Sequence, residues 1–92
     1  MKYIVIRVSK DNEPLMEAGI TFPKELVHAD VSEAITNMLT TKYQWECETV
    51  SAGNWDVTRG LCSGKSDTLN LKSRGEEDER IIRLSDNNFH HL

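Results

Sequence analysis

The tripeptide Gly64-Lys65-Ser66 is the segment whose residue types most directly suggest chemistry, because the same order occurs in phosphate-binding loops. The complete motif requires a glycine five positions before Gly64, where this chain has Arg59, and Gly60 is one position short. A long helix must also follow the loop, whereas the residues from 67 to 71 read as extended. The spacing therefore argues against a Walker-type nucleotide hydrolase.

The residues around this tripeptide still have the composition of an anion-binding loop. Residues 59–74 carry four cations against one carboxylate, a net charge of +3, whereas residues 1–58 sum to −4 and residues 75–92 to −3. Cations, hydroxyl donors and glycine backbone together can hold a phosphate or an acidic side chain. The candidate binding residues are Arg59, Ser63, Lys65, Ser66, Lys72 and Arg74. The alternative is a solvated loop whose cations offset the acidic remainder.

Metal binding and catalysis have little support in the sequence. His28 precedes a predicted helix and His90-His91 lie in the tail, without the Cys-pair or His-pair spacing of a structural zinc site. Cys62, near Lys65, could be a thiol with a lowered pKa, but no base or orienting acid can be assigned to it. We therefore expect no metal, no cofactor and no enzymatic activity.

The composition predicts one small domain covering residues 1–92. Hydrophobic residues make up 38% of the chain and charged residues 28%, which is typical of a globular protein. A net charge of −4 gives the whole chain no electrostatic reason to bind nucleic acid or anionic lipid. The first apolar run is interrupted by Arg7 and is too short for a signal peptide or a membrane span. We therefore expect a cytoplasmic location and no membrane partner.

Alternating apolar residues predict a first β-hairpin from strands at 2–8 and 16–22. The register that places both apolar sets on one face pairs Val8 with Met16, Ile6 with Ala18, and Ile4 with Ile20. A helix is predicted to follow over residues 30–41, with Asp30 as its N-cap and Glu33 completing a capping box. Its apolar stripe consists of Val31, Ala34, Ile35, Met38 and Leu39.

A second hairpin is predicted from strands at 43–49 and 55–61, joined by a three-residue loop with Gly53 in a left-handed conformation. This register pairs Thr49 with Trp55, Cys47 with Val57, and Tyr43 with Leu61. It also places Cys47 toward the core and Cys62 on the other face, so we expect two free thiols. Tyr43, Trp45 and Trp55 are expected to cap this hairpin in the core, whereas an exposed tryptophan would indicate a protein-binding hot spot.

A short helix from about Glu76 to Leu84 is predicted next, with Ser73 and Glu76 as a second capping box and a loose tail at 85–92. Its acidic start, residues 76–79, is interpreted as a solvated helix terminus; the alternative is an acidic face that mimics nucleic-acid phosphates. The predicted fold is therefore a single α+β domain in the order ββαββα, with an antiparallel sheet covered on one face by the helix at 30–41.

Several segments resemble short uncharacterised proteins encoded by tailed phages and prophages. They are Phe22-Pro23 with Leu26-Val27-His28-Ala29-Asp30-Val31, Val50-Ser51-Ala52-Gly53, Cys62-Ser63-Gly64-Lys65-Ser66 through Thr68-Leu69, and Leu71-Lys72-Ser73-Arg74 with the acids after it. The resemblance implies a phage context and the cytoplasm of the host cell, but no functional residues. Small phage proteins of this kind are often inhibitors or modulators of a host protein.

Three functions are therefore considered. The leading expectation is a non-enzymatic protein-binding module that acts on a host or defence-system factor through the 59–74 loop and the exposed strand faces. The alternatives are an anion- or nucleotide-binding protein that uses Lys65 and Ser66, and a minor structural virion protein. A homodimer formed through a sheet edge fits all three, since no obvious gatekeeper residue protects every edge.

Overall fold

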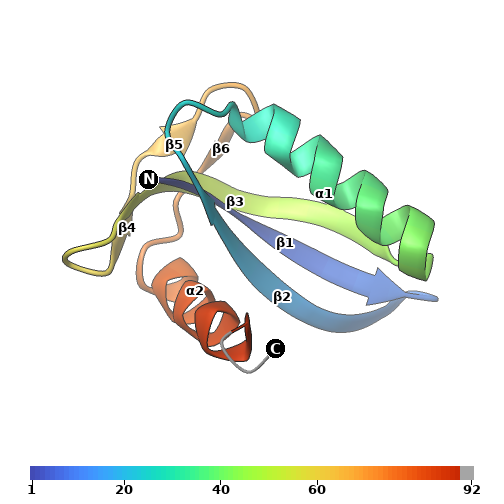
Figure 1. Ribbon diagram of the computed structural model, residues 1–92. Coiled ribbons are helices and arrows are strands. Elements are labelled where there is room, and N and C mark those ends of the chain that lie inside the picture. Colours follow the sequence, from blue (N-terminus) through green and yellow to red (C-terminus); the bar gives the residue numbers. More distant parts are fainter. Residues whose placement is uncertain (90–92) are drawn as a thin grey trace.

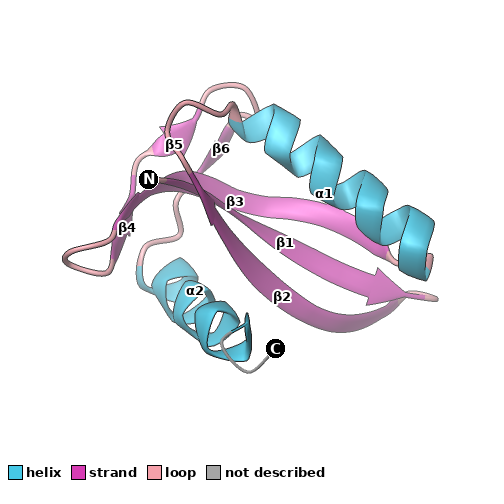
Figure 2. Ribbon diagram, viewed as in Figure 1, coloured by secondary structure: helices cyan, strands magenta, loops and turns pink. Residues whose placement is uncertain are grey.

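The computed structural model describes the backbone of residues 1–89 and the side chains of residues 1–85 (Figures 1 and 2). Its elements are β1 (Lys2–Lys10), β2 (Glu13–Phe22), α1 (His28–Tyr43), β3 (Glu46–Asp56), β4 (Leu61–Ser63), β5 (Lys65–Ser66), β6 (Leu71–Lys72) and α2 (Glu76–Phe89). The α+β class is confirmed. The predicted ββαββα order lacked the short β5 and β6 strands, which form a small sheet of their own.

The main sheet is antiparallel, with the strand order β2-β1-β3-β4. The two helices lie on opposite faces of it, so the molecule has three layers, whereas the sequence predicted a sheet covered on one face by the helix at 30–41 (Figure 1). Strand β1 lies between β2 and β3 and is buried on both sides. Ile4, Ile6 and Val8 face α1, while Tyr3 and Val5 face α2, and each is at most 1% exposed.

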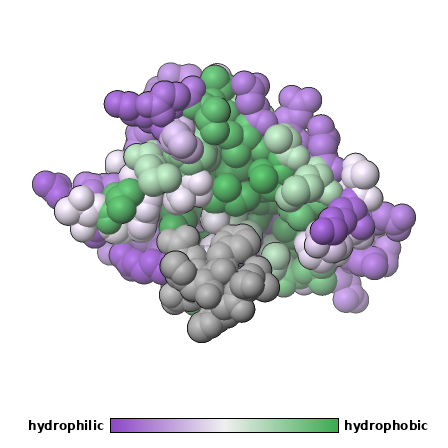
Figure 3. Space-filling model, in the orientation of Figure 1, coloured by the Kyte–Doolittle hydropathy of each residue, from purple (hydrophilic) through white to green (hydrophobic). Residues whose placement is uncertain are grey.

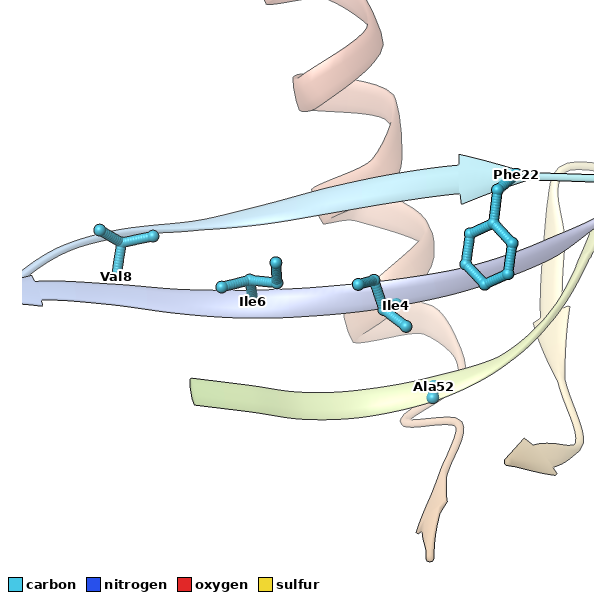
Figure 4. Packing of buried hydrophobic residues seen from close by; sticks show 5 residues of the cluster. All are labelled: Ile4, Ile6, Val8, Phe22 and Ala52. Atoms are coloured by element: carbon cyan, nitrogen blue, oxygen red, sulfur yellow. The ribbon is translucent and has the colours of Figure 1, made fainter. Parts of the chain in front are cut away.

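Each face of the sheet therefore has its own hydrophobic core. On the α1 face, Phe22 and Ala52 join the apolar residues of β1 (Figure 4). On the α2 face, Tyr3 and Val5 pack with Cys62 and Ile82. Cys47 packs against the first core and Cys62 belongs to the second, and both thiols are free, as expected.

The predicted register of the first hairpin is confirmed, since β1 and β2 pair Val8 with Met16 and Ile4 with Ile20. The turn between the strands is made by Asp11 and Asn12, both with positive φ values of 52° and 66°. Asn and Asp tolerate this left-handed conformation better than other non-glycine residues. The pairing carries a bulge between Val8 and Ser9.

Helix α1 begins two residues before the predicted start and ends at Tyr43. The predicted N-cap Asp30 is wrong: Val27 holds the N-cap position without a side-chain cap, and Asp30 lies in the first turn. The His28 ring donates a hydrogen bond from Nε2 to the carbonyl oxygen of Gly53 (2.9 Å), which ties the helix start to β3. Val31, Ile35 and Leu39 pack on the core as predicted, but Ala34 and Met38 are exposed.

The second hairpin was predicted incorrectly. Residues 51–53 are not a turn but the buried middle of β3, whose partner there is β1, with Ile4 opposite Ala52. Gly53 is needed because a Cβ atom at this position would lie 2.4 Å from the carbonyl oxygen of Ser63. The turn lies instead at 57–60, and β3 and β4 then pair Trp55 with Cys62.

Local hydrogen bonds explain why the chain turns at 57–60. The Asp56 carboxylate accepts hydrogen bonds from the backbone amides of Thr58 and Arg59, both at 3.1 Å, and Gly60 adopts a φ of +68°. An aspartate that accepts amides two and three residues later is a recognised turn-forming feature. The sequence therefore held a competing turn signal that the apolar alternation of residues 55–61 obscured.

Helix α2 is longer than predicted, because it extends from Glu76 to Phe89 and so includes part of the expected loose tail. Ser73 is not a helix cap; its hydroxyl accepts the amide of Gly75, which has a φ of +64°. Ile82 is fully buried against the sheet, whereas Leu84 is 58% exposed. The rest of the predicted tail, residues 90–92, lies outside the described residues. Among the described helices, none combines the length and apolar character that crossing a membrane requires.

Candidate functional site

An apolar groove lies between α1 and β2. Helix α1 packs over β3 and β1, which leaves the α1-facing side of β2 without a covering helix. The groove has a volume of about 480 Å³, and Figure 3 shows apolar side chains across the centre of the molecule between the positions of α1 and β2. Its lining consists of Ile6, Val8, Met16, Ala18, Gly19, Ile20, Thr21, Ile35, Met38, Leu39, Lys42, Tyr43 and Trp45.

The walls of this groove carry large apolar side chains that are open to solvent. Met16 on β2 and Met38 on α1 are each 52% exposed, and Tyr43 is 43% exposed. Methionine is flexible and polarisable, so it adapts its shape to different apolar partners. Because these exposed apolar side chains line one groove, the groove is the candidate binding surface among the described residues.

One end of the groove is aromatic and positively charged. The Tyr43 ring stacks on Trp45 with a centroid distance of 4.4 Å and an interplanar angle of 21°. The Lys42 ammonium lies 5.3 Å from the Tyr43 ring centroid, within the range of a cation–π interaction. Among the residues that line the groove in the described chain, Lys42 alone carries a charge. Tyr43 is exposed, whereas Trp45 is partly buried and packs against the core of the α1 face, so the predicted core position holds for Trp45 and is wrong for Tyr43.

Helix α2 caps an outward-facing amide on each edge of the sheet. The Gly19 amide of β2 donates a hydrogen bond to the Ser85 hydroxyl (2.9 Å), and the Cys62 amide of β4 donates to the Glu79 carboxylate (2.9 Å). Ser85 and Glu79 are both buried. An extended chain therefore cannot pair along the full length of β2 without displacing Ser85, and covering an edge is a known way to prevent unwanted pairing.

The structure separates the six candidate residues of the 59–74 loop. Arg59 is exposed at the turn before β4 and pairs with Asp56 at 3.8 Å, while Ser63 is exposed in β4. Ser66 is 2% exposed, and its hydroxyl accepts the Leu69 amide at 3.2 Å. Lys65, Ser66, Lys72 and Arg74 line one hollow of about 490 Å³ together with Val50, Asp67, Asn70 and Leu71. The predicted site is thus brought together only in part.

Arg74 is engaged by carboxylates and is not free for an anion. Its Nε atom donates to the Asp78 carboxylate at 2.7 Å, and its Nη2 atom donates to Glu17 at 2.8 Å. A third, more exposed ion pair joins it to Glu77 at 3.4 Å. The residue that looked like part of an anion site on sequence therefore connects the start of α2 to β2.

The buried acceptor in this network is Asp78, which is fully buried beneath the sheet. Its carboxylate also accepts hydrogen bonds from the Tyr3 hydroxyl (2.5 Å), the Ser51 hydroxyl (2.8 Å) and the Arg74 amide (2.9 Å). Burial alone would raise the pKa of Asp78, but the hydrogen bonds from Tyr3 and Arg74 outweigh it and lower that pKa. Burial and the Asp78 charge raise the pKa of Tyr3. Sequence reasoning missed this group because it interpreted residues 76–79 as a solvated run.

The remaining reactive side chains have structural partners. His28 is buried, lies edge-on to Phe22 at 5.5 Å and donates to the Gly53 carbonyl oxygen. Burial raises the pKa of the Cys62 thiol to about 11, so the hypothesis of an activated thiol is contradicted. Within the described part of the chain, no three His, Cys, Asp or Glu side chains lie together as metal ligands would.

Comparisons with known proteins add no relative to this picture. No protein-family model matches the chain, and neither a curated protein nor a solved structure matches it. The function must therefore be argued from the geometry of the described residues, in which the groove between α1 and β2 brings together several large apolar side chains that are open to solvent.

Proposed function

We propose that this chain is a non-enzymatic protein-binding module that receives one amphipathic helix of a partner protein in the groove between α1 and β2. The observation that carries the proposal is the uncovered apolar strip of the sheet beside α1, with Met16 and Met38 half exposed on its two walls. Such helix-in-groove recognition relies on apolar side chains at helical spacing that enter a groove of this kind.

The dimensions of the sheet favour a helix as the occupant. Helices packed side by side lie about 8–10 Å apart, which is about the width of two strands spaced 4.8 Å apart. The α1-facing side chains of β1 are already buried, so the open part of this face is the β2 strip and the flank of α1 beside it. One further helix packed beside α1 would lie over β2 and cover this strip.

The capped edge of β2 disfavours the main alternative, an extended peptide that adds a strand to the sheet. Such a peptide needs the outward amides of the edge strand, and the Gly19 amide is already bonded to Ser85. A helix needs no backbone hydrogen bond from β2, since its own amides are bonded internally. The resemblance to small phage proteins suggests that the partner is a host or defence-system protein.

The proposal is tested with a display library of 18-residue helical peptides whose apolar residues recur at i, i+3, i+4 and i+7. We expect selected peptides to bind the wild-type protein and Met38→Glu or Met16→Glu to weaken binding at least tenfold. The matched control is Val57→Glu, which makes the same kind of change at an exposed residue (62%) in the turn before β4. Circular dichroism of each variant checks that the fold is retained.

Three outcomes would overturn this function. The first is selection of peptides whose binding is unaffected by both methionine variants, which would place the interaction elsewhere. The second is a wild-type dimer in light scattering that Met38→Glu converts to a monomer, because the groove would then be occupied by a second copy of this chain. The third is a selected peptide that circular dichroism of the complex shows to be bound in an extended, non-helical conformation.

Anion binding by the β5–β6 hairpin is a second candidate, favoured by one observation. Lys65 and Lys72 are direct partners in this two-stranded ladder, and like charges placed opposite each other are unfavourable unless an anion lies between them. The Asp67 carboxylate forms an exposed ion pair with Lys65 at 3.5 Å and so offsets the charge of Lys65 but not that of Lys72. A thermal upshift with inorganic phosphate that Lys65→Ala removes would support this function, and no shift at millimolar phosphate would exclude it.

A further inference from the structure

We infer that the partner helix lies antiparallel to α1 and carries an aspartate or glutamate in its first turn, opposite Lys42. This inference rests on the proposed function and adds the direction and charge of the bound helix. Three observations carry it: the single charge in the groove, its place at the C-terminal end of α1, and the charge near the other end of that helix.

The first observation is the isolation of Lys42. It lies in the last turn of α1, and no carboxylate is among the described residues that line the groove with it. A cation at the rim of an apolar groove attracts an acidic residue on the partner and so fixes its register. The Tyr43 ring lies beside Lys42 and is exposed. Apolar residues of the partner helix that neighbour its acidic residue can pack on this ring.

The second observation concerns the helix dipole. Helix α1 ends at Tyr43, and the C-terminal end of a helix carries a partial negative charge. A neighbouring helix in the groove is favoured when its positive N-terminal end lies beside this one, which is the antiparallel arrangement. An acidic residue in the first turn stabilises the partner helix itself and, in that arrangement, also lies nearest to Lys42.

The third observation is the acidic character at the start of α1. Asp30 lies in its first turn, is exposed and lies outside the groove lining. A parallel partner helix would bring its acidic first turn toward this end of α1, where the charge of Asp30 would oppose it. An antiparallel partner would instead bring its last turn, where basic residues are favoured, toward Asp30. The charges at the two ends of α1 thus favour the same direction.

The experiment compares two helical peptides with identical apolar residues, taken from a library-selected binder. One carries glutamates in the first turn and lysines in the last turn, and the second has these charges exchanged. We expect the first peptide to bind about twofold to fivefold more tightly at low salt, as for an exposed ion pair. Lys42→Glu should remove or reverse this preference, and about 0.5 M salt should reduce it.

The control is Lys72→Glu, which changes the net charge equally at an exposed residue outside the groove and should leave the preference unchanged. Equal binding of the two peptides, or a preference that survives Lys42→Glu, would overturn the direction while leaving the groove as the binding site. In either case, if Met38→Glu abolishes the binding of both peptides, the groove is the binding site and only the direction is wrong. If Met38→Glu leaves the binding of both peptides unchanged, the proposed function itself fails.

Discussion

The two faces of the sheet are closed in different ways. On the α2 face, a buried carboxylate receives four hydrogen bonds, an isoleucine is fully buried, and side chains of α2 cap both edges of the sheet. On the α1 face, the helix packs on the core through Val31, Ile35 and Leu39, and a groove stays open beside it. One face is closed by specific polar contacts, and the second remains apolar and accessible.

This difference indicates a division of roles between the helices. Polar networks that are fully satisfied make a structure rigid and specific, because every alternative arrangement leaves a buried group without its partner. No buried side-chain nitrogen or oxygen in the described residues lacks a hydrogen-bond partner. Helix α2 therefore stabilises the domain, whereas α1 supplies one wall of an apolar groove that stays open to solvent.

The largest expected effect comes from removing the buried carboxylate on the α2 face. Asp78→Ala leaves the Tyr3 and Ser51 hydroxyls and the buried part of Arg74 without their acceptor, and we expect a loss of about 3–5 kcal/mol in the free energy of unfolding. Urea titration measures it, with Tyr3→Phe as a milder variant that removes one donor. Glu77→Ala, at a carboxylate 52% exposed, is the control and should change stability by less than about 0.5 kcal/mol.

The second prediction compares one apolar residue from each face. Ile82→Ala on α2 should cost about 2–4 kcal/mol, because Ile82 is fully buried and the cavity cannot be filled. Met38→Ala on α1 should cost less than about 1 kcal/mol, because half of that side chain is already exposed to water. Equal losses in urea unfolding would contradict the view that the two faces differ in closure.

The third prediction concerns acid. Hydrogen bonds and ion pairs in the native state lower the pKa of Asp78 and also of Glu17, whose largest contribution is the hydrogen bond from Arg74. A carboxyl group with a lowered pKa contributes stability that is complete above its ordinary value, near pH 4, and is lost as the pH falls through its lower native value. We expect the free energy of unfolding to fall below about pH 4, and to fall less steeply in Asp78→Asn. An identical pH profile for this variant would remove Asp78 as the cause.

The same contrast explains what the sequence could and could not predict. The first hairpin was predicted with its register because every pair in it is local and the apolar alternation is strict. The continuation of β3 through Ser51 and Ala52 was not, because these small residues form a turn or a close-packed strand depending on what lies against them. Here the neighbours are β1 and Asp78, which are 27 or more residues away in sequence.

The candidate site shows the same limit. The cations of the 59–74 loop were visible in the sequence, but their partners were not, so Arg74 could not be recognised as bound to Glu17, 57 residues before it. Met38 was placed in the core by its helical spacing, since periodicity predicts which face a residue shares but not how far the neighbouring strand extends. The groove arises because one helix is too narrow to cover the sheet, which no single segment encodes.

The smallest expected effect tests whether α2 protects the edge of β2. Ser85→Ala leaves the Gly19 amide without its acceptor, and we expect a loss of about 1 kcal/mol in stability together with faster hydrogen exchange of that amide. Ser63→Ala, at an exposed serine, is the matched control. If the capped amide also prevents strand pairing between copies, the Ser85→Ala protein should associate at high concentration in light scattering, whereas wild type should not. If the Gly19 amide hydrogen exchanges no faster in Ser85→Ala than in wild type, then burial by α2, and not the Ser85 hydroxyl, protects this edge.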